Sequence, residues 1–251
     1  MNVSLYQAAS ALNATDRWQE TIAQNLASSS LPGFKKQEFS VAGVQAGVLP
    51  YSPAGAAGSI RQLLMPAGGT ATNFSAGEMR LTSVPTDLAI QGSGFFEVQL
   101  PNGGAAYTRD GELHVSAQGQ LVSKQGHLVM GEAGPIQLDP RNPAPISISP
   151  GGDVSQGADP KGKIKLVEFN NQRLLTPISA GYFIADNPNL IPRPSPASTV
   201  RQGYLEAANT STVLEMANMI SAMRTFEANQ RMAQIHDERM GRVISELGTN
   251  S

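Results

Sequence analysis

The chain has 251 residues, a formal net charge of −2 and only 15% charged side chains. This balance argues against nucleic acid or an acidic membrane as a partner. The absence of cysteine excludes disulfides, thiolate metal sites and cysteine nucleophiles. The length suits one large domain or two small ones.

The N-terminal stretch has no basic segment followed by an apolar run, so we expect no cleaved secretory signal. No apolar stretch approaches the roughly twenty residues that span a bilayer. We therefore expect either a cytoplasmic protein or one exported by a route that reads no such signal.

The first predicted element is a helix within residues 1–35. Leu5, Leu12, Ile22 and Leu26 follow a seven-residue rhythm, with mainly small and polar side chains between them. Pro32-Gly33 ends the pattern, because proline cannot continue a helix.

The next stretch, residues 36–80, is rich in Gly, Ala, Ser, Thr and Pro. A flexible linker and an extended arm that orders against a neighbour both fit this composition. Because a loop of this length is unusual inside a compact domain, we favour the extended arm.

Residues 81–200 predict a central antiparallel β domain. Pro101-Asn102-Gly103-Gly104 and Asp110-Gly111 are turn signals, and Ile164–Phe169 alternates between apolar and polar side chains. Regular turns without intervening helical patterns favour a sandwich or an irregular barrel. A proline-rich return, residues 188–196, ends this domain.

The last predicted element is a long helix within residues 201–251. Thr212 and Glu215 form a capping box, and Gly248 is the expected stop. The apolar side chains recur in steps of three and four and so form one stripe: Val213, Met216, Ile220, Met223 and Phe226.

These elements predict an α+β fold. The long N- and C-terminal helices are expected to pair as a coiled-coil-like α domain, with the antiparallel β domain between them in the sequence. Two interpretations of the helices remain open: a two-helix lid on a single core, or packing between copies of the chain.

The sequence offers no evident catalytic chemistry. His114, His127 and His236 are dispersed, and Gly92-x-Gly94 lacks the third glycine and the helix of a dinucleotide site. We therefore predict no enzyme activity, no catalytic, cofactor-binding or metal residues, no cofactor and no small-molecule substrate.

Four motifs remain to be explained: the stretches Asn25–Lys35, Asp87–Phe96, Tyr107–Gly111 with Gly119–Val122, and Gln202–Glu206 with Asn209 and Glu215–Ile220. Together they resemble bacterial flagellar basal-body rod proteins, in the flagellar hook-basal body family. Their order along the chain covers both ends and the middle. The Gly126–Ile136 region resembles the proximal-rod type more than the distal-rod type.

The resemblance implies a structural axial subunit that passes unfolded through the flagellar type III export apparatus without a cleaved signal. Its terminal helices would assemble helically with copies of itself and with other rod or hook subunits, transmitting torque and enclosing the export channel. No nucleic acid and no membrane insertion are implied. The expected assembly interface comprises Leu5, Leu12, Ile22, Asn25, Leu26, Gly33, Phe34, Val213, Met216, Ile220, Met223 and Phe226.

Three alternatives compete with this interpretation. A hook or hook-associated axial protein shares the terminal motifs, but the hook subunit is usually longer. A secreted adhesin or spike with a β head would favour a stricter heptad pattern. An enzyme of cell-wall remodelling would be revealed by turnover of peptidoglycan.

Overall fold

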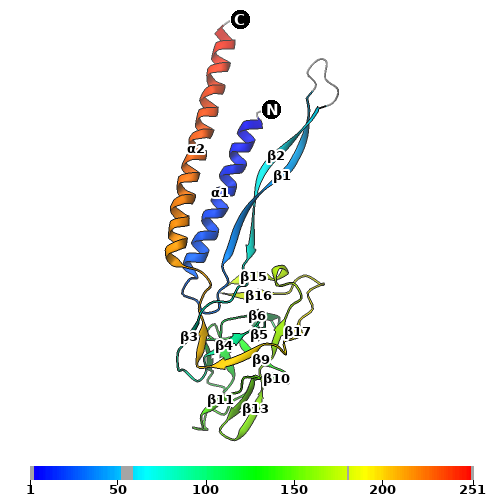
Figure 1. Ribbon diagram of the computed structural model, residues 1–251, viewed down its shortest axis with the longest axis vertical. Coiled ribbons are helices and arrows are strands. Elements are labelled where there is room, and N and C mark those ends of the chain that lie inside the picture. Colours follow the sequence, from blue (N-terminus) through cyan, green and yellow to red (C-terminus); the bar gives the residue numbers. More distant parts are fainter. Residues whose placement is uncertain (1–2, 52–58, 180, 250–251) are drawn as a thin grey trace. The chain divides into compact units, whose positions relative to one another are not determined.

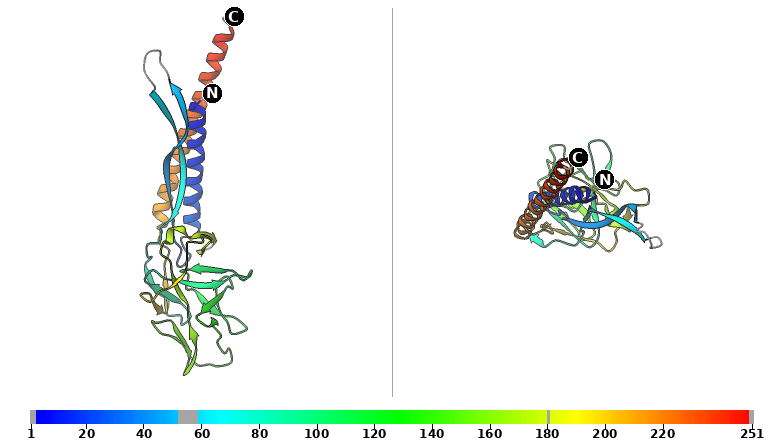
Figure 2. Two further views of the ribbon diagram at one scale, coloured as in Figure 1. Left: turned by 90° about the vertical axis from the view of Figure 1, so that its right-hand side faces the viewer. Right: turned by 90° about the horizontal axis from the view of Figure 1, so that it is seen from above.

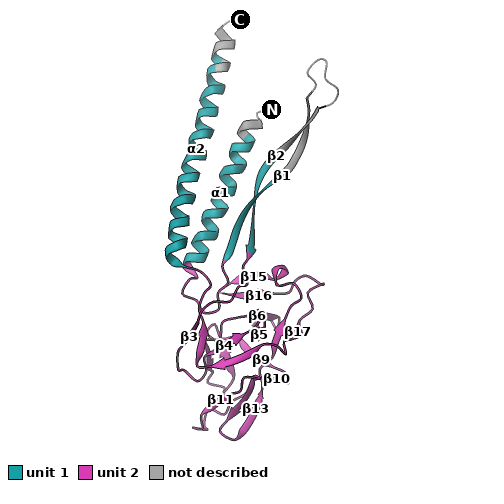
Figure 3. Ribbon diagram, viewed as in Figure 1, with its two compact units in different colours: residues 1–26, 37–71, 211–251 teal, residues 27–36, 72–210 magenta. Residues whose placement is uncertain are grey.

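The computed structural model describes residues 3–51, 59–179 and 181–249. The chain divides into two compact units, which are coloured separately in Figure 3. Unit 1 comprises residues 1–26, 37–71 and 211–251, and unit 2 comprises residues 27–36 and 72–210. The chain therefore passes between the units four times.

Unit 1 contains the two α-helices of the described part and one two-stranded antiparallel ribbon. Its elements are α1 (Val3–Ala27), β1 (Gln37–Tyr51), β2 (Ser59–Thr72) and α2 (Thr212–Thr249). Within this unit, α1 lies between α2 and the β1–β2 ribbon (Figures 1 and 2). The stretch expected as an extended arm, residues 36–80, thus contains the two long strands.

Specific contacts fasten α1 to the ribbon. Trp18 stacks on Phe39 with ring centroids 6.3 Å apart. Asn25 binds Gln37 twice, since its Nδ2 donates to the Gln37 carbonyl at 2.8 Å and its Oδ1 accepts from the Gln37 N–H at 2.9 Å. The ribbon therefore begins at a defined position beside the end of α1. An isolated two-stranded hairpin is only marginally stable, so the ribbon depends on such packing.

The largest sheet of unit 2 follows the order β15-β16-β6-β5-β9-β8-β7. Strand β10 pairs with β9, and β14 pairs with both β17 and β5. The strands are β5 (Phe95–Gln99), β6 (Ala105–Thr108), β7 (Leu113–Val115), β8 (Leu121–Ser123), β9 (Leu128–Gly131), β10 (Gly134–Pro135), β14 (Leu166–Glu168), β15 (Thr176–Ser179), β16 (Tyr182–Ile184) and β17 (Arg193–Pro194).

Smaller sheets complete unit 2. One has the order β11-β12-β13, and the pairs β18-β4 and β19-β3 join segments that are far apart in the sequence. A 3-10 helix, η1, covers Gln172–Leu174. The strands are β3 (Met79–Leu81), β4 (Leu88–Gln91), β11 (Ile146–Ile148), β12 (Asp153–Gln156), β13 (Asp159–Lys163), β18 (Thr199–Gln202) and β19 (Tyr204–Glu206).

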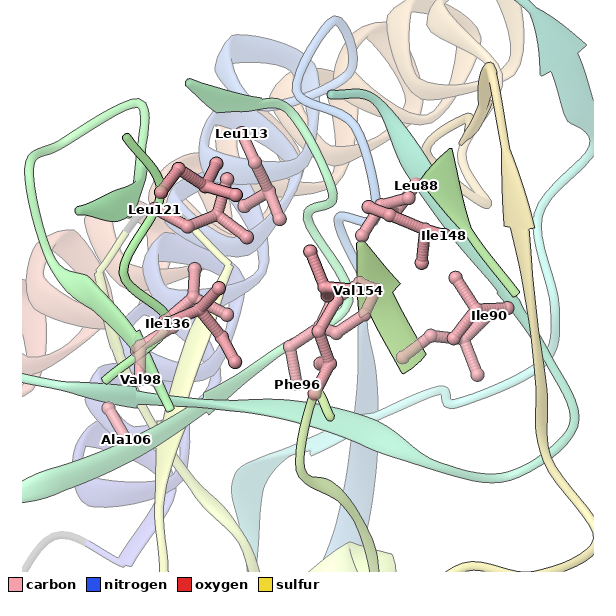
Figure 4. Packing of buried hydrophobic residues seen from close by; sticks show 14 of the residues in the cluster. Leu88, Ile90, Phe96, Val98, Ala106, Leu113, Leu121, Ile136, Ile148 and Val154 are labelled. Atoms are coloured by element: carbon pink, nitrogen blue, oxygen red, sulfur yellow. The ribbon is translucent and has the colours of Figure 1, made fainter. Parts of the chain in front are cut away.

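Strand β5 separates two hydrophobic clusters. Successive side chains of a strand point to opposite faces, so Phe95 enters one cluster while Phe96 and Val98 enter the other. Figure 4 shows the second cluster, in which side chains of β4, β5, β8 and β12 point toward one another. Both faces of β5 are covered, so its first four residues are all buried, including Glu97.

The expected central β domain is confirmed, but the expected fold class is wrong in its helical part. The described chain is mostly β-strand, and its two α-helices do not evidently form a paired coiled coil. The physical reason lies in the stripe of α2. Most of its large apolar side chains are exposed, so they cannot supply the buried seam that such a coiled coil requires.

Candidate functional site

The main candidate surface is the apolar stripe of α2. Val213, Met216, Ile220 and Met223 are between 52% and 79% exposed. Their spacing of three and four residues places them on one side of the helix. We call these four residues the α2 stripe. Single exposed apolar residues are ordinary on protein surfaces, whereas a contiguous set indicates a contact with another molecule.

The opposite side of α2 is the one that packs within unit 1. Ala222 is fully buried and Phe226 is half-buried. Asn229 donates from its Nδ2 to the Thr15 hydroxyl of α1 at 3.1 Å. Ala222, Phe226 and Asn229 therefore lie on the internal side, and the side chains of the α2 stripe face away from it.

The remaining interface residues expected from the sequence have different surroundings. Ile22 and Asn25 are buried in α1, and Leu12 and Leu26 are half-buried. The Leu5 side chain lies outside the described part of the chain. Gly33 and Phe34 are buried in unit 2. The twelve residues thus do not form a single surface.

A second feature was not expected: three of the motifs meet inside unit 2. The Gly33 N–H donates to the Glu206 carbonyl at 2.7 Å. A Cβ at Gly33 would lie 2.3 Å from the Arg109 carbonyl carbon, and the φ of Gly33 is +65°. Only glycine tolerates both the left-handed backbone and this close approach. We call the meeting point of Lys35, Arg109 and Glu206 the polar junction.

The polar junction is built around the Glu206 carboxylate. Lys35 Nζ donates to its Oε1 at 2.5 Å, and Arg109 Nη1 donates to its Oε2 at 3.3 Å. The Gly77 N–H also donates to Oε1, at 2.8 Å. All three charged side chains are at most 3% exposed. Two buried cations therefore share one buried carboxylate.

Burial disfavours the charged forms of Lys35 and Arg109, and the Glu206 carboxylate favours them. Burial lowers the pKa of Lys35, while the charge and hydrogen bond of Glu206 raise it and the Arg109 charge lowers it further. Burial likewise lowers the pKa of Arg109, against the raising effect of Glu206. The Arg109 guanidinium also lies over the Phe95 ring, 5.1 Å from its centroid. Its Nε is buried without a hydrogen-bond partner in the described part of the chain.

Asn209 extends the junction toward the start of α2. Its Oδ1 accepts from the Lys36 N–H at 2.7 Å, and its Nδ2 donates to the carbonyls of Asn73 and Ser75 at 2.8 and 3.0 Å. One side chain thus joins three stretches of unit 2. Each of them leads directly to a point where the chain passes between the units.

Sequence reasoning missed the roles of Lys35, Arg109 and Glu206. Each lies within a quoted motif, and that position was the available signal. The sequence could not show that they meet, because 171 positions separate Lys35 from Glu206.

Among the described residues, no group of three or more His, Asp or Glu side chains could hold a metal ion. The helices of the described chain include none that is long and apolar enough to cross a membrane. His114 is exposed, and His127 and His236 are half-buried in different units.

Comparisons with known proteins identify the family. Residues 89–156 match the model of the flagellar hook protein FlgE/F/G D1 domain. Residues 201–246 match that of the flagellar basal body rod FlgEFG protein C-terminal region. The first segment covers the central motifs except for Asp87 and Leu88, and the second contains the C-terminal motif.

Curated relatives extend the similarity to the whole chain. The flagellar basal-body rod protein FlgF of Caulobacter vibrioides is 34% identical, over 99% of this chain and 99% of the relative. FlgF of Escherichia coli is 31% identical, over 96% and 97%. FlgG of Borreliella burgdorferi, also a flagellar basal-body rod protein, is 33% identical, over 95% and 96%. The chain belongs to the family of flagellar basal-body rod proteins, as its four motifs indicated. The sequence identities to the FlgF relatives and to the FlgG relative are too similar to decide which of these two proteins the chain resembles more.

Proposed function

We propose that the chain is a structural subunit that assembles helically with copies of itself and with other axial subunits. The α2 stripe carries this proposal, because it is a set of large apolar side chains that the chain itself leaves exposed. In a helical array the same stripe would meet the same neighbouring surface at every copy. Many identical contacts would transmit torque along the rod and enclose the export channel.

The energetics suit contacts that form on assembly. Full burial of one Val, Ile or Met side chain contributes about 1.5–3 kcal/mol. Each stripe residue is already partly covered, so the further gain is roughly 1 kcal/mol for each, or several kcal/mol for the stripe. Such a contact is weak in a pair of subunits and strong when it recurs along a polymer.

Further parts of the proposal rest on the family. The subunit would be located in the basal body, exported through the flagellar type III apparatus without a cleaved signal. Its role would be structural and non-enzymatic. Residues 1–35 and 201–251 would supply the axial core, joined by the 36–80 arm to the central 81–200 domain.

The test is to locate the subunit in assembled flagella. A tagged copy that restores motility to a deletion strain should be found in the rod of purified basal bodies. The deletion strain should lack a complete rod. Recovery of the functional tagged protein only outside the basal body would contradict the proposal, and peptidoglycan turnover by the purified protein would contradict a purely structural role.

A further inference from the structure

The polar junction joins three stretches of unit 2 that are distant in sequence: residues 33–36, 73–77 and 203–209. The Gly33 N–H binds the Glu206 carbonyl, and the Gly77 N–H binds the Glu206 carboxylate. The Ala207 N–H donates to the Glu78 carbonyl at 2.8 Å. The C-terminal stretch, residues 203–209, therefore touches both of the others through backbone and side-chain groups.

Charge makes Lys35, in the first stretch, and Arg109, directly after β6, depend on Glu206 of the third stretch. Lys35 keeps one other described acceptor, the Ser75 carbonyl at 2.8 Å. Arg109 keeps the Gly92 carbonyl, at 2.7 Å from its Nη2. Without the Glu206 carboxylate both cations would remain buried without a counter-charge, which is among the most unfavourable arrangements in a protein interior.

The hydrophobic core does not share this dependence. The buried members of the two clusters are hydrophobic residues between Leu88 and Val200, and the three charged residues of the polar junction are not among them. One stretch has its own anchor, since the Phe74 ring packs 5.2 Å from that of Phe183. The contacts between the two sets are that of Phe74 and that of Arg109, whose guanidinium lies over the Phe95 ring. Otherwise core packing and junction closure are carried by different residues.

We propose that Glu206 and Asn209 act as a latch that closes unit 2 independently of its hydrophobic core. While the latch is open, residues 33–36 and 75–77 are released together, whereas Phe74 and the core strands stay in place. Closing the latch fixes three segments in one step. They are the segment after α1, the segment after β2 and the segment that precedes α2. This device would operate in the free subunit, so it does not rest on the proposed assembly.

Hydrogen exchange of the full chain tests the latch. Glu206→Gln keeps the shape of the side chain but removes its charge. We expect the Gly33, Gly77 and Ala207 amides to exchange about tenfold to hundredfold faster, since a hydrogen bond or ion pair to a charged group is lost. The Leu121 and Lys165 amides, which bind the carbonyls of Ile136 and Met130, should keep their wild-type protection. Glu112→Gln is the matched control, because Glu112 forms an exposed pair with Lys124 and should change neither set.

Two outcomes would overturn the latch. Equal loss of protection in both sets would make Glu206 part of the global core, and unchanged protection of the first set would remove its role. Lys35→Met in the Glu206→Gln background should restore part of the protection, because it removes a stranded cation; purely additive effects would contradict the pairing. If Glu206→Gln does not fold, hydrogen exchange of the wild-type protein tests the latch instead. At low denaturant its junction amides should exchange through a smaller opening than its core amides.

Discussion

Replacing Ile220 by Asp tests whether the α2 stripe is an assembly surface. Ile220 is 54% exposed in the chain, so a carboxylate placed there remains in contact with water in the free subunit. The change should cost the monomer about 0.5 kcal/mol or less through helix propensity. We therefore expect the purified variant to melt like the wild type.

In the assembled rod the same carboxylate would be covered by a neighbour. The lost apolar burial is roughly 1 kcal/mol per copy, and desolvation of an unpaired carboxylate adds several kcal/mol after relaxation. A free-energy penalty of this size lowers the binding constant of each subunit for the rod by about a thousandfold or more. Motility should be lost while protein level and export stay normal.

Two variants on the same helix sharpen this test. Ser221→Asp adds the same charge at the adjacent, exposed position, rotated by about 100° around the helix axis, and should keep more motility. Phe226→Asp affects a half-buried residue and should lower the melting temperature as well. A motile Ile220→Asp strain would refute the reasoning. So would a variant whose melting transition disappears, because the stripe would then be part of the monomer's own core.

Three further predictions concern unit 2. Burial raises the pKa of Asp110 to about 6 from 3.8, so its folded form binds the proton more tightly and this group stabilises the protein as pH falls through 6 toward 4. Asp110→Asn should remove about 2–3 kcal/mol of that pH dependence, measured by urea unfolding at several pH values; parallel wild-type and variant profiles would contradict the shift. Gly33→Ala should destabilise by several kcal/mol through clash and backbone strain, whereas Gly103→Ala, with φ +83° but nothing within 4 Å of its Cβ, should cost only about 1 kcal/mol. Phe96→Ala should cost about 3–5 kcal/mol in thermal or urea unfolding, because Phe96 is fully buried; a loss below 1 kcal/mol would argue against the cluster.

The sequence was sufficient to recognise the family. Motifs depend on residue types in a fixed order, and the full-length relatives confirm that interpretation. Local signals were also reliable for the elements themselves. The helix ending before Pro32 appears as α1, which ends at Ala27, and the capping signal at Thr212 coincides with the first residue of α2. Turn signals such as Asn102-Gly103 separate β5 from β6.

The sequence was not sufficient to decide what each apolar side chain touches. Periodicity locates a stripe on a helix but does not say which side of the helix meets its own chain. For α2, that contact is made by Ala222 and Asn229, and the α2 stripe is exposed. The expected coiled-coil-like pairing was wrong for this reason.

Contacts between distant residues required the tertiary structure altogether. Lys35, Arg109 and Glu206 are unremarkable charges in the sequence, and only the fold places two cations around one buried carboxylate. Local propensity and periodicity act over a few residues, so the sequence by itself determined the two helices, the central β domain, their order and the family. It did not determine the β1–β2 ribbon within the expected arm. Burial and electrostatic pairing act through space, so the exposed face of α2 and the polar junction were decided only when the chain folded.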